Sequence, residues 1–146
     1  MKVAEVKERK TLYGLTVRTK NTNEANPSTA KIAPLWERFF SEIAPSLKNG
    51  AIVYGVYSNY ESDASGEFDI TACTNLEIPS LNSVIVNKGK YLVFSAKGDM
   101  PKVVIDTWGE IWKYFSSNEH EYERAYITDY EVYKNDQEID IWIGIK

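Results

Sequence analysis

Apolar residues recur at intervals of three and four in two stretches of the chain. These stretches are residues 31–43, KIAPLWERFFSEI, and residues 101–115, PKVVIDTWGEIWKYF. The spacing places the apolar side chains on one face of an α-helix. Ser28 is a candidate cap for the first helix, Pro34 fits only in its first turn, and Pro101 marks the start of the second helix. We therefore predict two amphipathic helices that each pack one face on the rest of the protein.

Runs rich in β-branched and aromatic residues precede and follow each predicted helix and are typical of strands. Each half of the chain then reads strand, helix, strand, strand. The short sequences FDITAC and IDIWIG stand at corresponding places in the two halves. The six predicted strands are residues 6–19, 51–60, 68–76, 84–97, 124–133 and 139–146.

The repeated order predicts an internal duplication within a single domain, residues 1–146. The pseudo-repeats are about 1–77 and 84–146, separated where Pro and Ser interrupt the pattern at 78–83. We expect an α+β fold in which two β-α-β-β units share one antiparallel sheet, with two helices on one face and a central groove between them. The alternative is one unduplicated α+β domain whose hairpins resemble each other by chance.

The composition excludes several classes of protein. A net charge of −4 argues against direct nucleic acid binding by this chain. The charged start MKVAEVKERK does not resemble a signal peptide, and the apolar run AIVYGVY is too short to span a membrane. One cysteine and one histidine leave no internal disulfide and make a His-based metal site or catalytic triad improbable. We expect a cytoplasmic protein with no cofactor and no metal.

The predicted strand TDYEVY, residues 128–133, carries Glu131 between two tyrosines. Facing solvent, or paired with a Lys or Arg, Glu131 would need no further explanation. Facing inward without a partner, its carboxylate would cost several kcal/mol, about what a cationic ligand could relieve. Aligning the halves on Ser62-Asp63 and Asn135-Asp136 sets Tyr57 opposite Tyr130 and Ser58 opposite Glu131, so the acid is absent from the first half.

Aromatic side chains are candidates for the walls of a pocket around Glu131, and packing in the core is the alternative for each of them. A shift of one residue in strand register would reverse which strand aromatics share its face. The candidates are Trp36, Trp108 and Trp112 on the predicted helices and Tyr57, Tyr91 and Phe94 on the predicted strands.

Four motifs carry a resemblance to a known family. They are I-x-x-L-W-x-R-F-F at 32–40, YGVY at 54–57, GEFDITA at 66–72 and DYEVY at 129–133. In this order the chain resembles the GyrI-like effector-binding domain, which occurs at the C-terminus of AraC-type and MerR-type multidrug-responsive regulators and in standalone, including cassette-encoded, proteins. The resemblance implies a duplicated β-α-β-β fold and a central pocket for lipophilic, often cationic, molecules. It also implies that Glu131 lies in that pocket.

The leading hypothesis is a module that binds small hydrophobic cations, as the ligand-sensing or sequestering part of a transcription-regulator-like protein. No helix-turn-helix precedes the domain, which departs from the regulator pattern. A homodimer or a regulatory protein are the partners we consider. The alternatives are a hydrolase of reactive small molecules that uses the pocket glutamate, as the resemblance suggests, and an inhibitor that binds a DNA-handling enzyme. We assign no catalytic residue.

Overall fold

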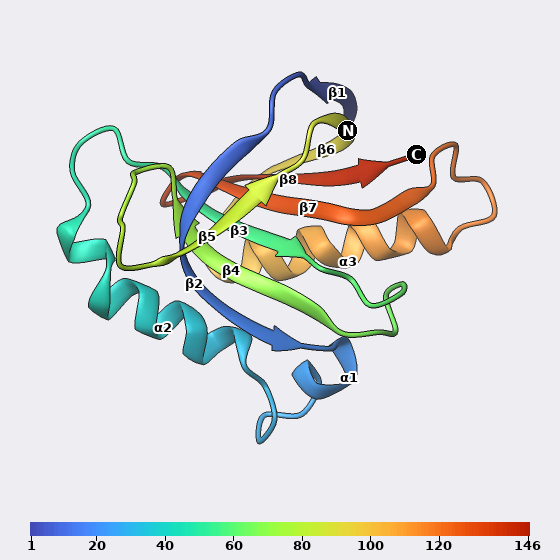
Figure 1. Ribbon diagram of the computed structural model, residues 1–146. Helices are drawn as coiled ribbons and strands as arrows, with labels where there is room; N and C mark the ends of the chain where they lie inside the picture. Colours follow the sequence, from blue (N-terminus) through green and yellow to red (C-terminus); the bar gives the residue numbers. More distant parts are fainter.

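The computed structural model describes residues 1–146 and contains one eight-stranded antiparallel sheet with helices on one side (Figure 1). The strands are β1 (Lys2–Val6), β2 (Lys10–Thr19), β3 (Val53–Ser58), β4 (Phe68–Thr74), β5 (Asn82–Val86), β6 (Gly89–Lys97), β7 (Arg124–Asn135) and β8 (Glu138–Ile145). The helices are α1 (Asn21–Glu24), α2 (Ile32–Glu42), a 3-10 turn at Ala44–Ser46, and α3 (Lys102–Ser116). No helix is long and apolar enough to cross a membrane.

The strand order is symmetric about the middle of the sheet. It runs β1-β6-β8-β7-β3-β4-β2-β5. The corresponding strands of the two halves, β1 and β5, β2 and β6, β3 and β7, and β4 and β8, therefore lie at equal distances from the middle of the sheet. The central pair β7 and β3 therefore lies on the pseudo-twofold axis. The predicted α+β class, with a duplicated unit and one antiparallel sheet, is confirmed.

Each half contains four strands rather than the predicted three. The expected strands 6–19 and 84–97 each divide in two, at the polar residues 7–9 and 87–88. The first strand of each half crosses to the other half, since β1 pairs with β6 and β5 pairs with β2. Two or three consecutive polar residues within a predicted strand were the signal of these connections.

The two main helices cover the strands on either side of the central pair, β3 and β7, and leave this pair uncovered in the middle. The α2 helix packs on β2 and β4, and α3 packs on β6 and β8. Leu35 and Phe39 of α2 and Ile111 of α3 are fully buried, as the helical spacing predicts. The strands β3 and β7 consequently form the floor of a seam between α2 and α3.

The α2 helix begins later than predicted, and Ser28 does not cap it. The Glu24 carboxylate accepts hydrogen bonds from the backbone N–H groups of Lys31 and Ile32, at 2.9 and 3.1 Å. A carboxylate at this end satisfies free N–H groups and complements the helix dipole. Pro34 lies in the first turn, as expected.

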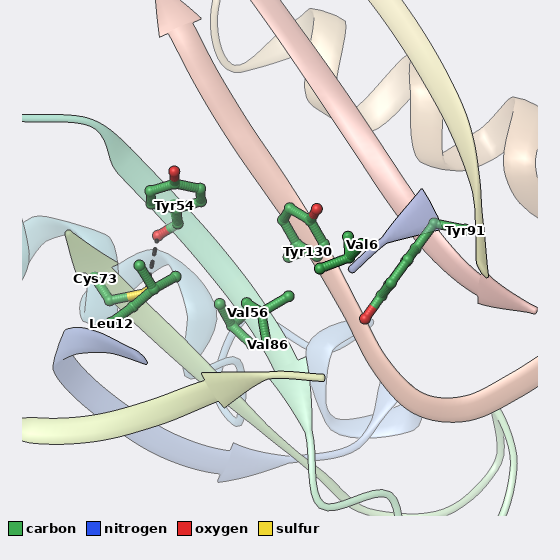
Figure 2. Close-up of a cluster of buried hydrophobic side chains, with 8 residues drawn as sticks. All are labelled: Val6, Leu12, Tyr54, Val56, Cys73, Val86, Tyr91 and Tyr130. Carbon is green, nitrogen blue, oxygen red and sulfur yellow. Dashed lines mark hydrogen bonds between the residues drawn. The ribbon is translucent and has the colours of Figure 1, made fainter. Parts of the chain in front are cut away.

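The opposite face of the sheet carries a further apolar cluster, shown in Figure 2. The sheet is curved so strongly that the edge strand β5 contacts β7 on this face. Tyr54, Tyr91 and Tyr130 lie in the cluster, and Cys73 is fully buried there as an apolar residue. The face behind the helices is therefore also closed by packed side chains.

Candidate functional site

The seam between the helices contains Glu131 at its floor. Strand register sets Glu131 of β7 directly opposite Gly55 of β3. Side chains two residues apart share a face of a strand, so Tyr57 and Tyr133 point to the same side as Glu131. Only 1% of Glu131 is exposed.

Three neutral groups donate hydrogen bonds to the Glu131 carboxylate. Tyr57 Oη donates to Oε2 at 2.9 Å, and Trp108 Nε1 donates to the same oxygen at 2.7 Å. Tyr133 Oη donates to Oε1 at 2.8 Å. The donors come from β3, α3 and β7, so the carboxylate ties both halves of the protein together.

No lysine or arginine forms an ion pair with Glu131. Burial raises the pKa of the Glu131 carboxyl above its ordinary value, and the hydrogen bonds from Trp108, Tyr133 and Tyr57 oppose that rise. Burial also raises the pKa values of Tyr57 and Tyr133, so both hydroxyls keep their protons and act as donors. A positive charge arriving at this carboxylate would meet no competing cation.

Aromatic rings surround the carboxylate on its outer side. The ring centroids of Trp36 and Tyr133 are 5.3 Å apart, and those of Tyr57 and Trp108 are 5.1 Å apart, both in edge-to-face contact. Phe40 stacks on Trp36 and is 56% exposed. The negative faces of such rings attract cations.

Glycine at position 55 makes room for the carboxylate. A Cβ atom there would lie 2.6 Å from Glu131 Oε1 and 3.0 Å from Cζ2 of Trp36, both closer than van der Waals contact. The Glu131 side chain therefore lies across the backbone of β3, with the Trp36 ring beside it. Gly55 is a positioning residue that sequence reasoning missed.

We expect Gly55→Ala to lower the free energy of unfolding by about 1–3 kcal/mol, because the added methyl group must displace the carboxylate or Trp36. The control is Gly109→Ala on the exposed side of α3, where no atom lies within 4 Å of the added Cβ. Alanine should stabilise that helix by about 0.5–1 kcal/mol. Urea unfolding measures both changes, and a shift in the same direction for both variants would contradict the packing described at Gly55.

The structure brings three of the predicted aromatic residues to Glu131 and leaves three away from it. Trp36, Tyr57 and Trp108 surround the carboxylate, and Tyr133 joins them as a residue that the sequence did not single out. Its position two residues after Glu131 on the same strand was the signal that could have found it.

The remaining three candidates lie elsewhere. Phe94 shares the face of Glu131, but Ile141 of β8 stands between them, two strand spacings or about 10 Å away. Tyr91 lies on the opposite face, in the cluster of Figure 2, where its hydroxyl donates to the Asn87 carbonyl. Trp112 was predicted on the apolar face of its helix, but it is 51% exposed and contacts no other aromatic ring.

A buried ion pair next to the site was also missed. Asp129 is fully buried and accepts hydrogen bonds from Arg124 Nη2 at 2.6 Å, Tyr60 Oη at 2.5 Å and the Gly144 N–H at 2.8 Å. It faces the same side of β7 as Glu131. Asp129 is therefore the paired acid of the strand, and Glu131 the acid without a cation.

The expected equivalence of the two halves is shifted by one residue in this region. Tyr57 points toward the helices with Glu131, whereas Tyr130 points to the opposite face and pairs with Val56. Aligning Tyr57 with Tyr130 was therefore wrong. The cause is the different length of the two hairpin connections, because nine residues, 59–67, join β3 to β4 and only two, 136–137, join β7 to β8, so the two aligned dipeptides are not equivalent.

Several solved structures share this fold. An integron cassette protein of Vibrio cholerae, VCH_CASS2, is 43% identical with a TM-score of 0.93, over 99% of this chain and 95% of that one. A protein of Staphylococcus aureus MU50 described as a putative bacterial transcription regulation protein is 21% identical, with a TM-score of 0.77 over 99% and 97% of the two chains.

A third structure is that of SAV2435 bound to tetraphenylphosphonium, at 20% identity and a TM-score of 0.74 over 99% of this chain and 93% of that one. No protein with a curated description matches this chain. The family model of the integron-associated effector binding protein, Cass2, matches residues 5–145. The chain, with its eight-stranded duplicated sheet and its buried glutamate under aromatic rings, belongs to the Cass2 family of integron-associated effector binding proteins.

Proposed function

We propose that this protein binds lipophilic organic cations at Glu131, between α2 and α3. One observation carries the proposal: the Glu131 carboxylate is buried among aromatic rings with three neutral donors and no cationic partner. A carboxylate in such surroundings is poorly solvated, and a ligand cation would relieve that cost. The tetraphenylphosphonium bound to SAV2435 supports this class of ligand.

The rings now cover the carboxylate, so a ligand that touches Glu131 must displace one of them. Trp108, Tyr57 and Tyr133 each hold Glu131 by a hydrogen bond, but Trp36 forms none with it. Moving Trp36 therefore breaks no hydrogen bond to Glu131 and disrupts only packing, which includes the rings of Phe39, Phe40 and Tyr133. We infer that the cation enters where Trp36 lies and then stacks against the ring that it displaced.

The role that follows is a ligand-sensing or sequestering module that acts beside a regulatory partner. Flat aromatic walls tolerate many shapes and one carboxylate pairs with any cation, so the specificity would be broad. A hydrolase that uses Glu131 is less well supported, because three donors already hold the Glu131 carboxylate and the other buried acid of the strand, Asp129, is paired with Arg124.

Titration with tetraphenylphosphonium tests the proposal, with quenching of Trp36 and Trp108 fluorescence as the signal. The matched probe is triphenylphosphine oxide, which has similar aromatic surface and no net charge. We expect the cation to bind at least about 30-fold more tightly, or roughly 2 kcal/mol. Equal affinities would show that the aromatic surface alone binds the probes and that the carboxylate contributes nothing.

The affinity for the cation should also depend on pH. Because burial raises the pKa of Glu131 in the folded protein, the carboxyl takes up a proton at a higher pH than an exposed glutamate would. Below that pKa a cation must displace the proton, and its affinity should fall by up to about tenfold per pH unit. Above it the affinity should be constant.

Calorimetry between about pH 4 and pH 8, in buffers of different ionisation enthalpy, measures both the affinity and the proton released. We expect release of up to one proton per cation bound below the pKa of Glu131, and none well above it. An affinity that is flat over this whole range would contradict the role of Glu131.

A further inference from the structure

The crossing of the first strands between the two halves brings two hairpin connections together. Val6 at the end of β1 pairs with Gly89, and Lys10 at the start of β2 pairs with Val86. Residues 7–9 and 87–88, which lie just beyond these pairs, therefore run beside each other near the pseudo-twofold axis. Both connections lie at the top of Figure 1, away from the two main helices.

A hollow of about 890 Å³ lies between these connections, and its charged lining is mainly basic. Four cationic side chains, Lys7, Arg9, Lys88 and Lys90, line it together with a single acid, Glu8. None of the four cationic side chains forms an ion pair. The protein as a whole has a net charge of −4, so a hollow lined by unpaired positive side chains differs from the rest of its surface.

The floor of the hollow is largely apolar and is held in place by hydrogen bonds. Tyr91, Ala125, Ile127 and Ile145 contribute to it, and Ile127 is 58% exposed. The Asn87 side chain donates to Thr128 Oγ1 at 3.0 Å, and the Asn87 carbonyl accepts from Tyr91 Oη at 2.6 Å. The β5–β6 connection is thereby fixed to the bulged start of β7, which holds one side of the hollow in place.

We propose that this hollow binds an organic phosphate with an aromatic or aliphatic body. Its volume falls within the usual range of ligand pockets, about 300–1,000 Å³. The cationic rim attracts the phosphate, and the exposed apolar floor accepts the body of the molecule. This site lies apart from the seam at Glu131 and has the opposite charge, so the protein would bind a cation and an anion at separate places.

The test is a titration of ¹⁵N-labelled protein with 1-naphthyl phosphate, followed by amide chemical shifts. The expected changes gather at residues 7–9, 87–90, 125–128 and 144–145. Pyrophosphate has the charge without the apolar body, and 1-naphthol has the body without the charge. We expect each of these to bind about tenfold more weakly than naphthyl phosphate, and binding of the phosphate to weaken with added salt.

The double variant Arg9→Ala/Lys88→Ala removes two exposed cations from the rim without touching the packed floor. We expect it to bind naphthyl phosphate about fivefold more weakly. The control Lys48→Ala/Lys113→Ala removes the same charge from exposed positions outside the hollow and should bind like the parent protein. Equal losses in both variants, shifts spread over the surface, or shifts produced only by a single-stranded oligonucleotide would each overturn the proposal.

Discussion

Glu131→Gln is expected to lower the affinity for tetraphenylphosphonium about 30-fold, the equivalent of roughly 2 kcal/mol. Glutamine has nearly the shape of glutamate, so the rings of Trp36, Tyr57, Trp108 and Tyr133 can keep their places around it. What the variant loses is the negative charge, which in this buried position is screened by little water. The affinity for neutral triphenylphosphine oxide should change by less than about twofold.

The design separates the loss of charge from a loss of structure. Glu110→Gln removes an acid from the exposed surface of α3, close in sequence to Trp108, and should bind the cation like the parent protein. Thermal unfolding of both variants shows whether the fold is kept. If Glu131→Gln bound tetraphenylphosphonium as tightly as the parent protein, the carboxylate would have no part in recognition, and the pH dependence expected above would disappear with it.

The aromatic candidates Trp36 and Trp108 came from a local signal, the helical period, which placed them toward the sheet. The inward position of Glu131 was implied only by the family resemblance, because alternation along DYEVY puts Glu131 and Tyr133 on one face without saying which face that is. Trp112 shows the limit of a helical pattern. Ile111 is fully buried, and a helix turns about 100° per residue, so Trp112 is carried toward solvent although it belongs to the same apolar series.

Strand register could not be obtained in the same way. Tyr91 and Phe94 are three residues apart and therefore face opposite sides of β6, but nothing in the sequence says which side faces the helices. The bulge in β7 between Arg124 and Asp129 adds to the difficulty, because no alternation of apolar and polar residues indicates it. The pairing of Asp129 with Arg124, which distinguishes the two acids of the strand, depends on this bulge.

The role of Gly55 could not be predicted either, because it depends on the residue that lies opposite on the neighbouring strand. A glycine in a strand usually weakens it, and only the opposing Glu131 explains its place here. Because Gly55 has no side chain, the Glu131 carboxylate and the Trp36 ring can both lie against its backbone. The acid, the glycine and the tryptophan come from β7, β3 and α2, so they form one site only after the two halves have folded together.

Asp129→Asn is expected to lower the free energy of unfolding by about 3 kcal/mol or more. Asp129 is fully buried, and Arg124 is only 9% exposed. Burial is the largest single influence and lowers the pKa of Arg124, but the charge and hydrogen bond of Asp129, together with Tyr60 and Tyr126, raise it overall, so the guanidinium keeps its charge. Removing the carboxylate charge leaves a buried cation uncompensated, which typically costs about 3–5 kcal/mol.

The double variant Arg124→Met/Asp129→Asn provides the control, because it also removes the guanidinium that the single variant leaves buried without its carboxylate. We expect it to recover part of the stability lost in Asp129→Asn, and urea unfolding of the two single variants and the double variant measures the coupling. Asp129 also accepts the Gly144 N–H and closes the bulge that sets the register of β7. The single variant should therefore weaken cation binding at Glu131 although it leaves that side chain intact. Stability within about 1 kcal/mol of the parent protein would show that the ion pair is not what anchors the bulge.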